Sequence, residues 1–381
     1  MTQDTPAKEE TMNATFQSKI TISTQYAPPK IYNTLAAREC TNASNCTDTS
    51  RVFQTDYIEN TTKIVFQNEM VAPTKYIASF DESESKDGSV KAYVVANEED
   101  PSTYTIHFQT TGNFNMPPDS SYYFSYFQKV TSVEGLEYVD TKNVTSMASM
   151  FYDMRNLISV DVSNFDTSSV TNMAFMFGNN GSVSSAPVLQ ELDLSNFNTY
   201  NVTNMRYMFS GQRNITKLNV SSFDTSNVTN MAGMFQYMND LTSFDISNFD
   251  TSNVTNMSDM FYGIEVPNLD LSHFDTPNVT NMAGMFRGVS TSTMNLSSFN
   301  TSKVTSMVQM FYQSPNLSNL DLSSFDTSKV TAMRWMFAST PSLTSITYGP
   351  NFIYANSADI EDMFLDSPVN KPTDPSWEGV L

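Results

Sequence analysis

The stretch NVTNMAGMFQYMNDLTSFDISNFDTS, from Asn227 to Ser252, is followed at once by a near-copy that begins NVTNMSDMF. Met-Phe pairs mark these and further copies at 150/151, 176/177, 208/209, 234/235, 260/261, 285/286, 310/311, 336/337 and 363/364. The intervals between successive pairs are 26, 32, 26, 26, 25, 25, 26 and 27 residues. Such a period predicts a solenoid, because one unit of this size cannot bury its own apolar side and must stack on its copies.

The spacing of apolar residues changes within one copy. Val228, Met231, Met234 and Phe235 fall at i, i+3, i+6 and i+7, which predicts a short helix whose apolar stripe faces inward. From Phe244 to Ile246 apolar and polar residues alternate, as they do on a short half-buried strand. The sequence therefore predicts coils of strand, turn, helix and turn, with equivalent strands paired in one parallel sheet.

Methionine is abundant in the same positions, with 24 in the whole chain. A flexible thioether fills uneven gaps between coils of slightly different length, so we expect these residues in the core. The competing interpretations are a methionine metal cluster and a peptide-binding groove.

Charge limits the classes of partner. The 381 residues include 40 acidic and 20 basic side chains, a formal net charge of −20, which disfavours nucleic acid and anionic lipid. No apolar run approaches the roughly 18 residues of a membrane span, and the opening MTQDTPAKEE lacks the features of a signal peptide. We therefore predict no membrane insertion, and either a cytosolic protein or one whose export and anchoring segments are missing from this sequence.

The two cysteines, Cys40 and Cys46, lie in CTNASNC. They could close a small disulfide loop in an oxidising compartment, and neither has a metal-ligand neighbour. The alternative is that both remain reduced. Asn-x-Ser/Thr triplets are frequent, but a chain rich in these residues contains them by composition alone.

The phrase LDLSSFDTSKVTAMRWMF at 320–337, with its copies, resembles the leucine-rich repeats of BspA-like bacterial surface proteins over about Val133 to Phe364. The resemblance implies an α/β fold, a right-handed leucine-rich-repeat solenoid with a parallel short-strand sheet and short helices. The preceding segment resembles the one that precedes these repeats in the family, and implies a β-rich N-terminal cap with a hairpin at Asp87-Gly88. The expected domains are an N-terminal extension at 1–50, the cap at 51–132, about nine coils at 133–365 and a C-terminal tail at 366–381.

The resemblance also implies a function. Proteins of this kind are non-enzymatic adhesion or host-interaction modules, so the expected partners are a host extracellular-matrix protein, mucin or another surface glycoprotein. The expected location is extracellular or at the cell surface, and no cofactor is expected. The alternatives are a passive stalk that displays another domain and, third, a carbohydrate-active enzyme.

Motifs for catalysis are scarce in the sequence. It contains no G-x-S-x-G, G-x-G-x-x-G, Walker-type loop, H-E-x-x-H or paired C-x-x-C. The two histidines, His107 and His273, lie in separate regions, and His273 occupies a position that Ser or Asn holds in other copies. We therefore interpret His273 as an ordinary substitution within the repeat and not as a general base.

One acidic column recurs at the predicted strand: Asp161, Asp193, Asn219, Asp245, Asp270, Asn295 and Asp321. Each is followed two positions later by Ser. These carboxylates could bond to serine and turn amides, bind calcium (weakly, at Asp245 and Asp270), or form a pair for glycoside hydrolysis. The face from Asp193 to Asp321 is the predicted contact surface, and its charge should favour a basic partner.

Bulky residues interrupt the small polar surface of some copies. The pairs Arg206-Tyr207 and Arg334-Trp335 are of the types enriched at binding hot spots. Tyr152, Tyr262 and Tyr312 follow their Met-Phe pairs directly. The alternative is that all of these are scattered solvated side chains. A six-residue insertion around 178–188 predicts a loop at the rim, most simply a tolerated insertion.

Overall fold

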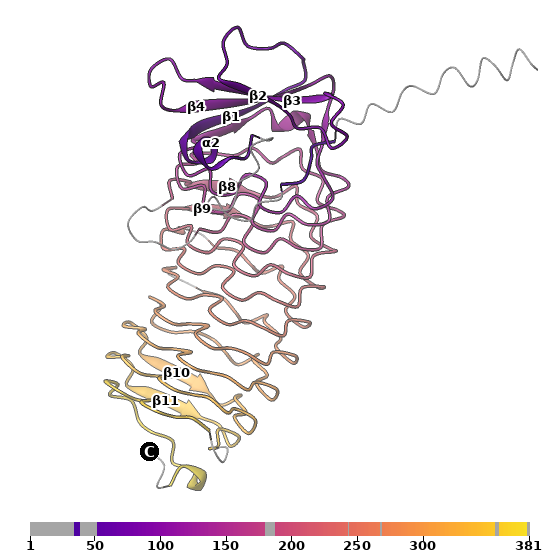
Figure 1. The fold of residues 1–381 in the computed structure, drawn as a ribbon. Coiled ribbons are helices and arrows are strands. Elements are labelled where there is room, and N and C mark those ends of the chain that lie inside the picture. The colour runs from indigo at the N-terminus through magenta and orange to yellow at the C-terminus, as the bar shows by residue number, and fades with distance from the viewer. Residues whose placement is uncertain are drawn as a thin grey trace, which may run out of the picture.

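The computed structural model describes residues 34–38, 52–179, 187–242, 244–266, 269–354 and 358–378. A sheet lies at one end, and the repeats stack away from it in chain order towards the C-terminus (Figure 1). The molecule is therefore an elongated stack with a sheet over its first layers.

The N-terminal sheet has five strands in the order β2-β3-β4-β1-β6. Its elements are α2 Thr55–Asn60, β1 Thr61–Gln67, β2 Ala78–Asp81, β3 Val90–Ala96, β4 Tyr104–Thr110 and β6 Ser132–Glu134. The β2-β3 and β3-β4 pairs are antiparallel, whereas β1 pairs in parallel with β4 and β6. The β2-β3 hairpin spans the predicted Asp87-Gly88 turn, where Gly88 has a φ of 78° and its N–H donates to Asp81 Oδ2 at 2.8 Å.

The remaining elements are short. They are β5 Phe114–Asn115, η2 Leu136–Tyr138, β7 Val139–Asp140, β8 Glu191–Asp193, β9 Lys217–Asn219, β10 Asn319–Leu322, β11 Ser345–Tyr348 and η3 Pro375–Trp377. Three separate two-stranded parallel sheets result, β5-β7, β8-β9 and β10-β11.

The predicted α/β leucine-rich-repeat solenoid is therefore wrong. The described residues contain a single α-helix, α2, which precedes the repeats, and the only other helical segments are the short 3-10 turns η2 and η3. The sheets are small and mixed in type, and the predicted continuous parallel sheet is absent from the described repeats. The helices and the sheet expected in every coil both have to be abandoned.

The predicted helices fail because the Met-Phe segments form consecutive turns. The Met234 N–H donates to Met231 O at 3.2 Å within a turn, whereas the Gly233 and Phe235 N–H groups donate to the next repeat. A helix would direct all of these groups to the residue four positions earlier. Gly233 has a φ of 60°, which no α-helix contains. An apolar spacing of three suits a run of turns as well as a helix, so the periodicity was ambiguous.

The continuous sheet fails because strand pairing is local. Both pairs of repeat strands join segments 26 residues apart, Asp193 with Asn219 and Asn319 with Ser345. The segments around Asp245, Asp270 and Asn295, separated by 25 residues each, have no assigned strand. Spacing alone does not decide pairing, because Asn219 and Asp245 are also 26 residues apart and form no ladder.

Parallel bridges nevertheless hold the repeats in register along the whole stack. One column of single bridges links each repeat to the next through Asp119, Ser146, Asn172, Asn204, Asn230, Asn256, Asn281, Ser306, Ala332 and Asp359. This column directly precedes the inner methionines, so the backbone is most regular on the Met-Phe side.

The core is a column of stacked rings. The phenylalanines of successive Met-Phe pairs stack face to face, as in Phe151 on Phe177 at 5.2 Å and 2° and Phe311 on Phe337 at 5.7 Å and 4°. The methionines beside them, such as Met231 and Met234, have no exposed surface. The prediction that methionine fills the core is confirmed.

Buried threonine hydroxyls join neighbouring repeats inside the stack. Thr225 Oγ1 donates to Asp250 O and accepts the Asp250 N–H, both at 2.8 Å. Thr199 makes the same two bonds to Asp224. Each hydroxyl thus provides hydrogen-bond partners for both the N–H and the C=O of one residue in the next repeat. In a sheet, a neighbouring strand would provide these partners.

The C-terminal segment packs on the last repeat. Trp377 is buried, stacks on Phe352 at 5.8 Å and donates its indole N–H to Phe352 O at 3.0 Å. The Asn370 side chain exchanges two hydrogen bonds with the backbone of Ile346 in β11. The segment predicted as a tail therefore covers the open end of the core.

Candidate functional site

The aspartate column has a local structural explanation. The carboxylates of Asp161, Asp193, Asp245, Asp270 and Asp321 each accept the N–H of the serine two positions later, at 2.9 to 3.0 Å. These serine hydrogen bonds lower the pKa of all five exposed carboxyls. Each aspartate therefore stabilises its own turn, which accounts for the repetition without a ligand.

The proposed calcium positions, Asp245 and Asp270, are fully exposed carboxylates that accept bonds from Ser247 and Ser272. In the described part of the chain, no three His, Cys, Asp or Glu side chains are grouped closely enough to hold a metal ion. Cys40, Cys46 and most of the loop at 178–188 lie outside the described residues.

The two histidines occupy unrelated environments. His273 Nε2 donates to Ile246 O of the preceding repeat at 2.8 Å, and Asn248 Nδ2 makes the equivalent bond to Val220 O at 3.2 Å. His107 lies in β4, where burial lowers its pKa and its Nδ1 is 3.2 Å from Gln67 Oε1. His273 thus makes the same hydrogen bond to the preceding repeat that Asn248 makes in its own repeat.

Arg206, Tyr207, Arg334 and Trp335 lie on the Met-Phe side of the core. Tyr207 and Trp335 hold the same position in their repeats, directly before Met-Phe, and both are half-buried. The Arg206 guanidinium lies 5.1 Å from the Phe175 ring centre, and that of Arg334 lies 4.7 Å from Trp335. The two pairs are separated by four intervening repeats, so they make no single pocket.

Further aromatic and arginine residues fill the space between these pairs. Rings and guanidinium groups contact one another from repeat to repeat: Phe175 stacks on Tyr207 at 4.9 Å, and the tilted rings of Tyr237 and Tyr262 are 4.5 Å apart. We call this surface the arginine–aromatic face and define it as Tyr152, Phe175, Arg206, Tyr207, Arg213, Tyr237, Tyr262, Arg287, Tyr312, Arg334 and Trp335.

The backbone under this face is strained. The residue before Met-Phe has a positive φ in every repeat, including Phe175, Tyr207 and Trp335 at 58°, 54° and 54°. Tyr237, three positions after its methionine, has a φ of 59°. Glycine takes this conformation at no steric cost and occupies it at Gly233, whereas other residues pay about 1–2 kcal/mol. Bulky aromatic residues are thus kept where the backbone favours glycine.

The rings are packed against the following repeat. A Cβ placed on Gly233 would lie 2.1 Å from the Tyr207 ring, so this ring lies across the glycine. Burial, with a hydrogen bond to Tyr262, raises the pKa of Tyr237 to about 12. The Tyr237 phenol therefore stays protonated at physiological pH.

Sequence reasoning missed Phe175, Arg213, Tyr237 and Arg287. No single copy marks them as unusual, because each is only one bulky residue in a variable position. The available signal was the recurrence of aromatic or arginine residues at the positions directly before and just after Met-Phe, once all copies are aligned.

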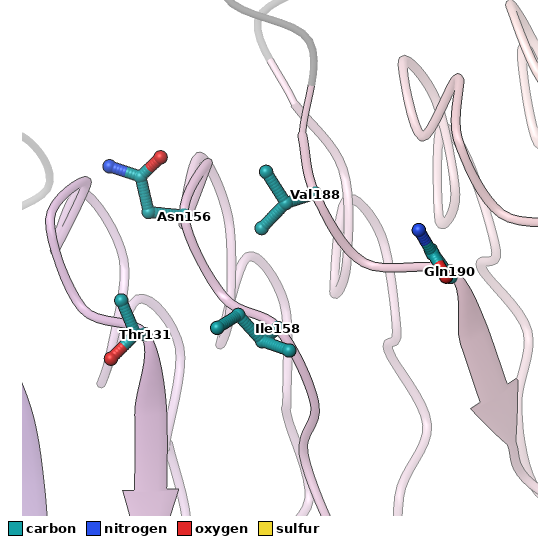
Figure 2. A pocket seen from close by; sticks show the side chains of 5 residues that line it. All are labelled: Thr131, Asn156, Ile158, Val188 and Gln190. Carbon is teal, nitrogen blue, oxygen red and sulfur yellow. The ribbon is translucent and has the colours of Figure 1, made fainter.

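A shallow hollow of about 450 Å³ lies on another part of the surface (Figure 2). It is lined by Thr131, Asn156, Ile158, Val188 and Gln190, with Ile158 62% exposed and Val188 37% exposed. In other repeats a threonine there bonds back to its predecessor, as Thr242 does to Thr216 O at 3.0 Å. The hollow opens where Ile158 and Gln190 replace that threonine, and its lining has no titratable group.

Comparison with known proteins gives one match. The model of a family described as Mycoplasma protein of unknown function, DUF285, matches residues 119–188, 181–292 and 264–377, more than half of the chain. The chain belongs to this family. The DUF285 matches overlap and together span the stacked repeats, and the description names no activity or ligand. No curated protein and no solved structure matches the chain.

The described part of the DUF285 chain contains no helix with the length and apolar character that a bilayer crossing requires.

Proposed function

We propose that this chain is a non-enzymatic binding module of a bacterial surface protein, which contacts a host extracellular-matrix protein, mucin or another surface glycoprotein. The observation that carries the proposal is the arginine–aromatic face, a row of rings and guanidinium groups that contact one another from repeat to repeat. Tyr, Trp and Arg are the residues that dominate binding energy at protein interfaces.

The stack suits this role because its side chains are already ordered. Arg287 is held between Tyr262 and Tyr312, with its guanidinium 4.6 and 5.0 Å from the two ring centres. Ordering such side chains on binding would otherwise cost about 0.5–1.5 kcal/mol each. A standard interface covers about 800 Å² on each partner, so contact would extend over several repeats.

The experiment is capture of mucin and matrix proteins by the immobilised chain and two variants. Tyr207→Ser with Trp335→Ser removes two rings from the face, and Ser149 shows that serine is accepted at this position with a φ of 56°. Asp193→Lys with Asp245→Lys and Asp270→Lys reverses the charge of the aspartate column instead. We expect the first variant to lose capture and the second to retain it.

The reverse pattern, with capture lost only in the lysine variant, would place the binding surface on the aspartate column. Failure of the folded wild-type chain to capture any of these partners would favour the alternative of a passive stalk. Thermal unfolding of both variants supplies the control for folding.

A further inference from the structure

Five side chains at the middle of the arginine–aromatic face form one continuous group. The Arg213 guanidinium lies 4.5 Å from the Tyr237 ring centre, Tyr237 and Tyr262 are 4.5 Å apart, and Arg287 lies between Tyr262 and Tyr312. We call Arg213, Tyr237, Tyr262, Arg287 and Tyr312 the arginine–tyrosine cluster.

The charge of this cluster is not neutralised by contact with carboxylates. Arg155 and Arg334 pair with acidic groups, whereas Arg213 and Arg287 form no ion pair within the part of the chain that the structure describes. Arg287 Nη1 donates to Gln309 Oε1 at 2.9 Å, and its Nε is buried without a hydrogen-bond partner. With twice as many acidic as basic residues in the chain, two unpaired guanidinium groups in one cluster are unexpected.

One carboxyl does lie near Arg287. Asp259 is half-buried, and burial raises its pKa while Arg287 acts in the opposite direction. Its Oδ1 lies over Gly284, only 2.2 Å from where a Cβ would stand, and not on the guanidinium. The in-plane N–H groups of Arg287 are therefore not occupied by Asp259.

The cluster presents guanidinium and phenol groups as hydrogen-bond donors. The guanidinium groups of Arg213 and Arg287 lie over ring faces, and the planar donors of a guanidinium match the two oxygens of a carboxylate. Burial raises the pKa of Tyr237, and the Tyr237 and Tyr262 hydroxyls are hydrogen-bonded to each other, so this pair supplies one further donor beside the guanidinium groups. Beyond the Arg287 bond to Gln309 and the bond between Tyr237 and Tyr262, the described residues place no carboxylate in contact with the guanidinium groups of the cluster.

Tyr237 occupies a position at which the backbone has a positive φ. Tyr237 has a φ of 59°, and the equivalent positions in the next two repeats are Gly263 and Gly288, with φ of 67° and 65°. Asp153, Gln313 and Ser339 hold the same position in other repeats, also with a positive φ, so this conformation belongs to the repeat and a bulky residue is accepted there.

We propose that the arginine–tyrosine cluster binds the carboxylates of an acidic segment, rich in Asp and Glu, of a protein partner. The proposal rests on the proposed binding function and names the chemistry of the partner. An acidic segment is favoured over a ligand with one acidic group because Arg213 and Arg287 come from different repeats, and Arg206, over the Tyr207 ring, adds a third guanidinium group to the same face.

The test uses the full chain and a fluorescent peptide of alternating Glu and Gly, with the corresponding Lys-Gly peptide and an acidic polysaccharide as comparisons. The variant Arg213→Gln with Arg287→Gln removes both charges. The matched control, Lys303→Gln with Lys329→Gln, changes the net charge equally at two exposed lysines of other surface positions. We expect about tenfold or greater loss of Glu-Gly affinity in the arginine variant and less than about twofold loss in the control.

Arg287→Lys refines the test, because lysine keeps the charge and loses the planar double donor. We expect it to weaken peptide binding several-fold, and melting curves must show that each variant is folded. Equal weakening in the arginine variant and the control would overturn the proposal, since it would show only an effect of net charge. Tighter binding to the polysaccharide than to the peptide, or no binding of the peptide by wild type, would also overturn it.

Failure of this inference is distinguishable from failure of the proposed function. Unchanged capture of mucin or matrix protein by the arginine variant would overturn the cluster while leaving the binding function in place. Absence of any captured partner for the wild-type chain would overturn the binding function itself.

Discussion

The two sides of the core differ in what their polar residues do. On one side, carboxylates such as Asp245 recur in nearly every repeat and bond to their own turn. On the other, residues such as Tyr237 and Arg287 interrupt the repeat, and Arg287 has no ion pair within the described residues. The centre of the Phe235 ring lies 4.8 Å from that of Phe244 and 6.0 Å from that of Phe249. These rings lie between the two sides, so both sides share one core.

The difference shows that repetition by itself is weak evidence for a ligand site. A uniform column is what a stack of turns needs for its own hydrogen bonds. Departures from the repeat that cost stability are better evidence, because the fold gives no reason to keep them.

The largest expected effect comes from the core that both sides share. Met234→Asp places an unpaired charge where no surface is exposed, between repeats that each depend on that interface. We expect loss of cooperative unfolding, measured by thermal melting, with Thr229→Asp at an exposed position of the same repeat as the control. An unchanged melt for Met234→Asp would show that the methionines do not hold the stack together.

The next effect separates the interior of the aspartate side from its surface. Thr225→Val keeps the shape but leaves the Asp250 N–H and C=O without partners, at a cost of about 2–3 kcal/mol. Thr229→Val removes a bond from an exposed hydroxyl to Thr203 O and should cost less than about 1 kcal/mol. Denaturant titration compares the two, and equal losses would refute the interior role of Thr225.

A smaller effect tests the packing beneath the arginine–aromatic face. Gly233→Ala combines a positive φ with a Cβ that would overlap the Tyr207 ring, so we expect about 1–2 kcal/mol of destabilisation. Gly288→Ala shares the positive φ, but its Cβ would meet Tyr262 only at 3.7 Å, and it should cost less. Equal costs, measured by thermal unfolding, would mean that the Tyr207 ring moves aside freely.

The smallest effect concerns the aspartate column and pH. The serine bonds lower the pKa of Asp245 and Asp270, so their contribution to stability is present above the unfolded-state pKa of about 3.9 and is lost as pH falls through the folded-state value. Asp245→Asn with Asp270→Asn should therefore flatten the stability curve slightly below about pH 4. Millimolar calcium should hardly change the melting temperature at pH 7, and a rise of many degrees that the variant abolishes would contradict the structural role of the column.

The core could be predicted from the sequence because burial follows apolar spacing directly. Met231, Met234 and Phe235 point inward in a helix and in a run of turns alike, so the prediction of their burial survived the wrong secondary structure. What the spacing could not supply was the direction of the backbone N–H groups. Gly233 is compatible with a turn, but Tyr and Trp rarely have a positive φ, so the conformation at Tyr207 and Trp335 could not be predicted from the residue types.

The site was only partly predictable for a similar reason. Tyr207 and Trp335 were recognisable as departures from the repeat, and so were Tyr262 and Tyr312. Arg213 and Arg287 were not, since their importance depends on rings supplied by neighbouring repeats, 24 to 25 residues away in the sequence. The double bond of Thr225 to Asp250 likewise depends on the backbone of the next repeat.

Chemical footprinting of a captured complex tests most directly which side binds. Arginine-specific dicarbonyl labelling reports on Arg206, Arg213 and Arg287, while carbodiimide labelling of carboxyls reports on Asp193, Asp245 and Asp321. Mass spectrometry of the free and bound chain would give the protection of each residue. We expect the three arginines to become protected and the three aspartates to stay reactive. Protection of the aspartates with unchanged arginine labelling would contradict a binding surface on the arginine–aromatic face.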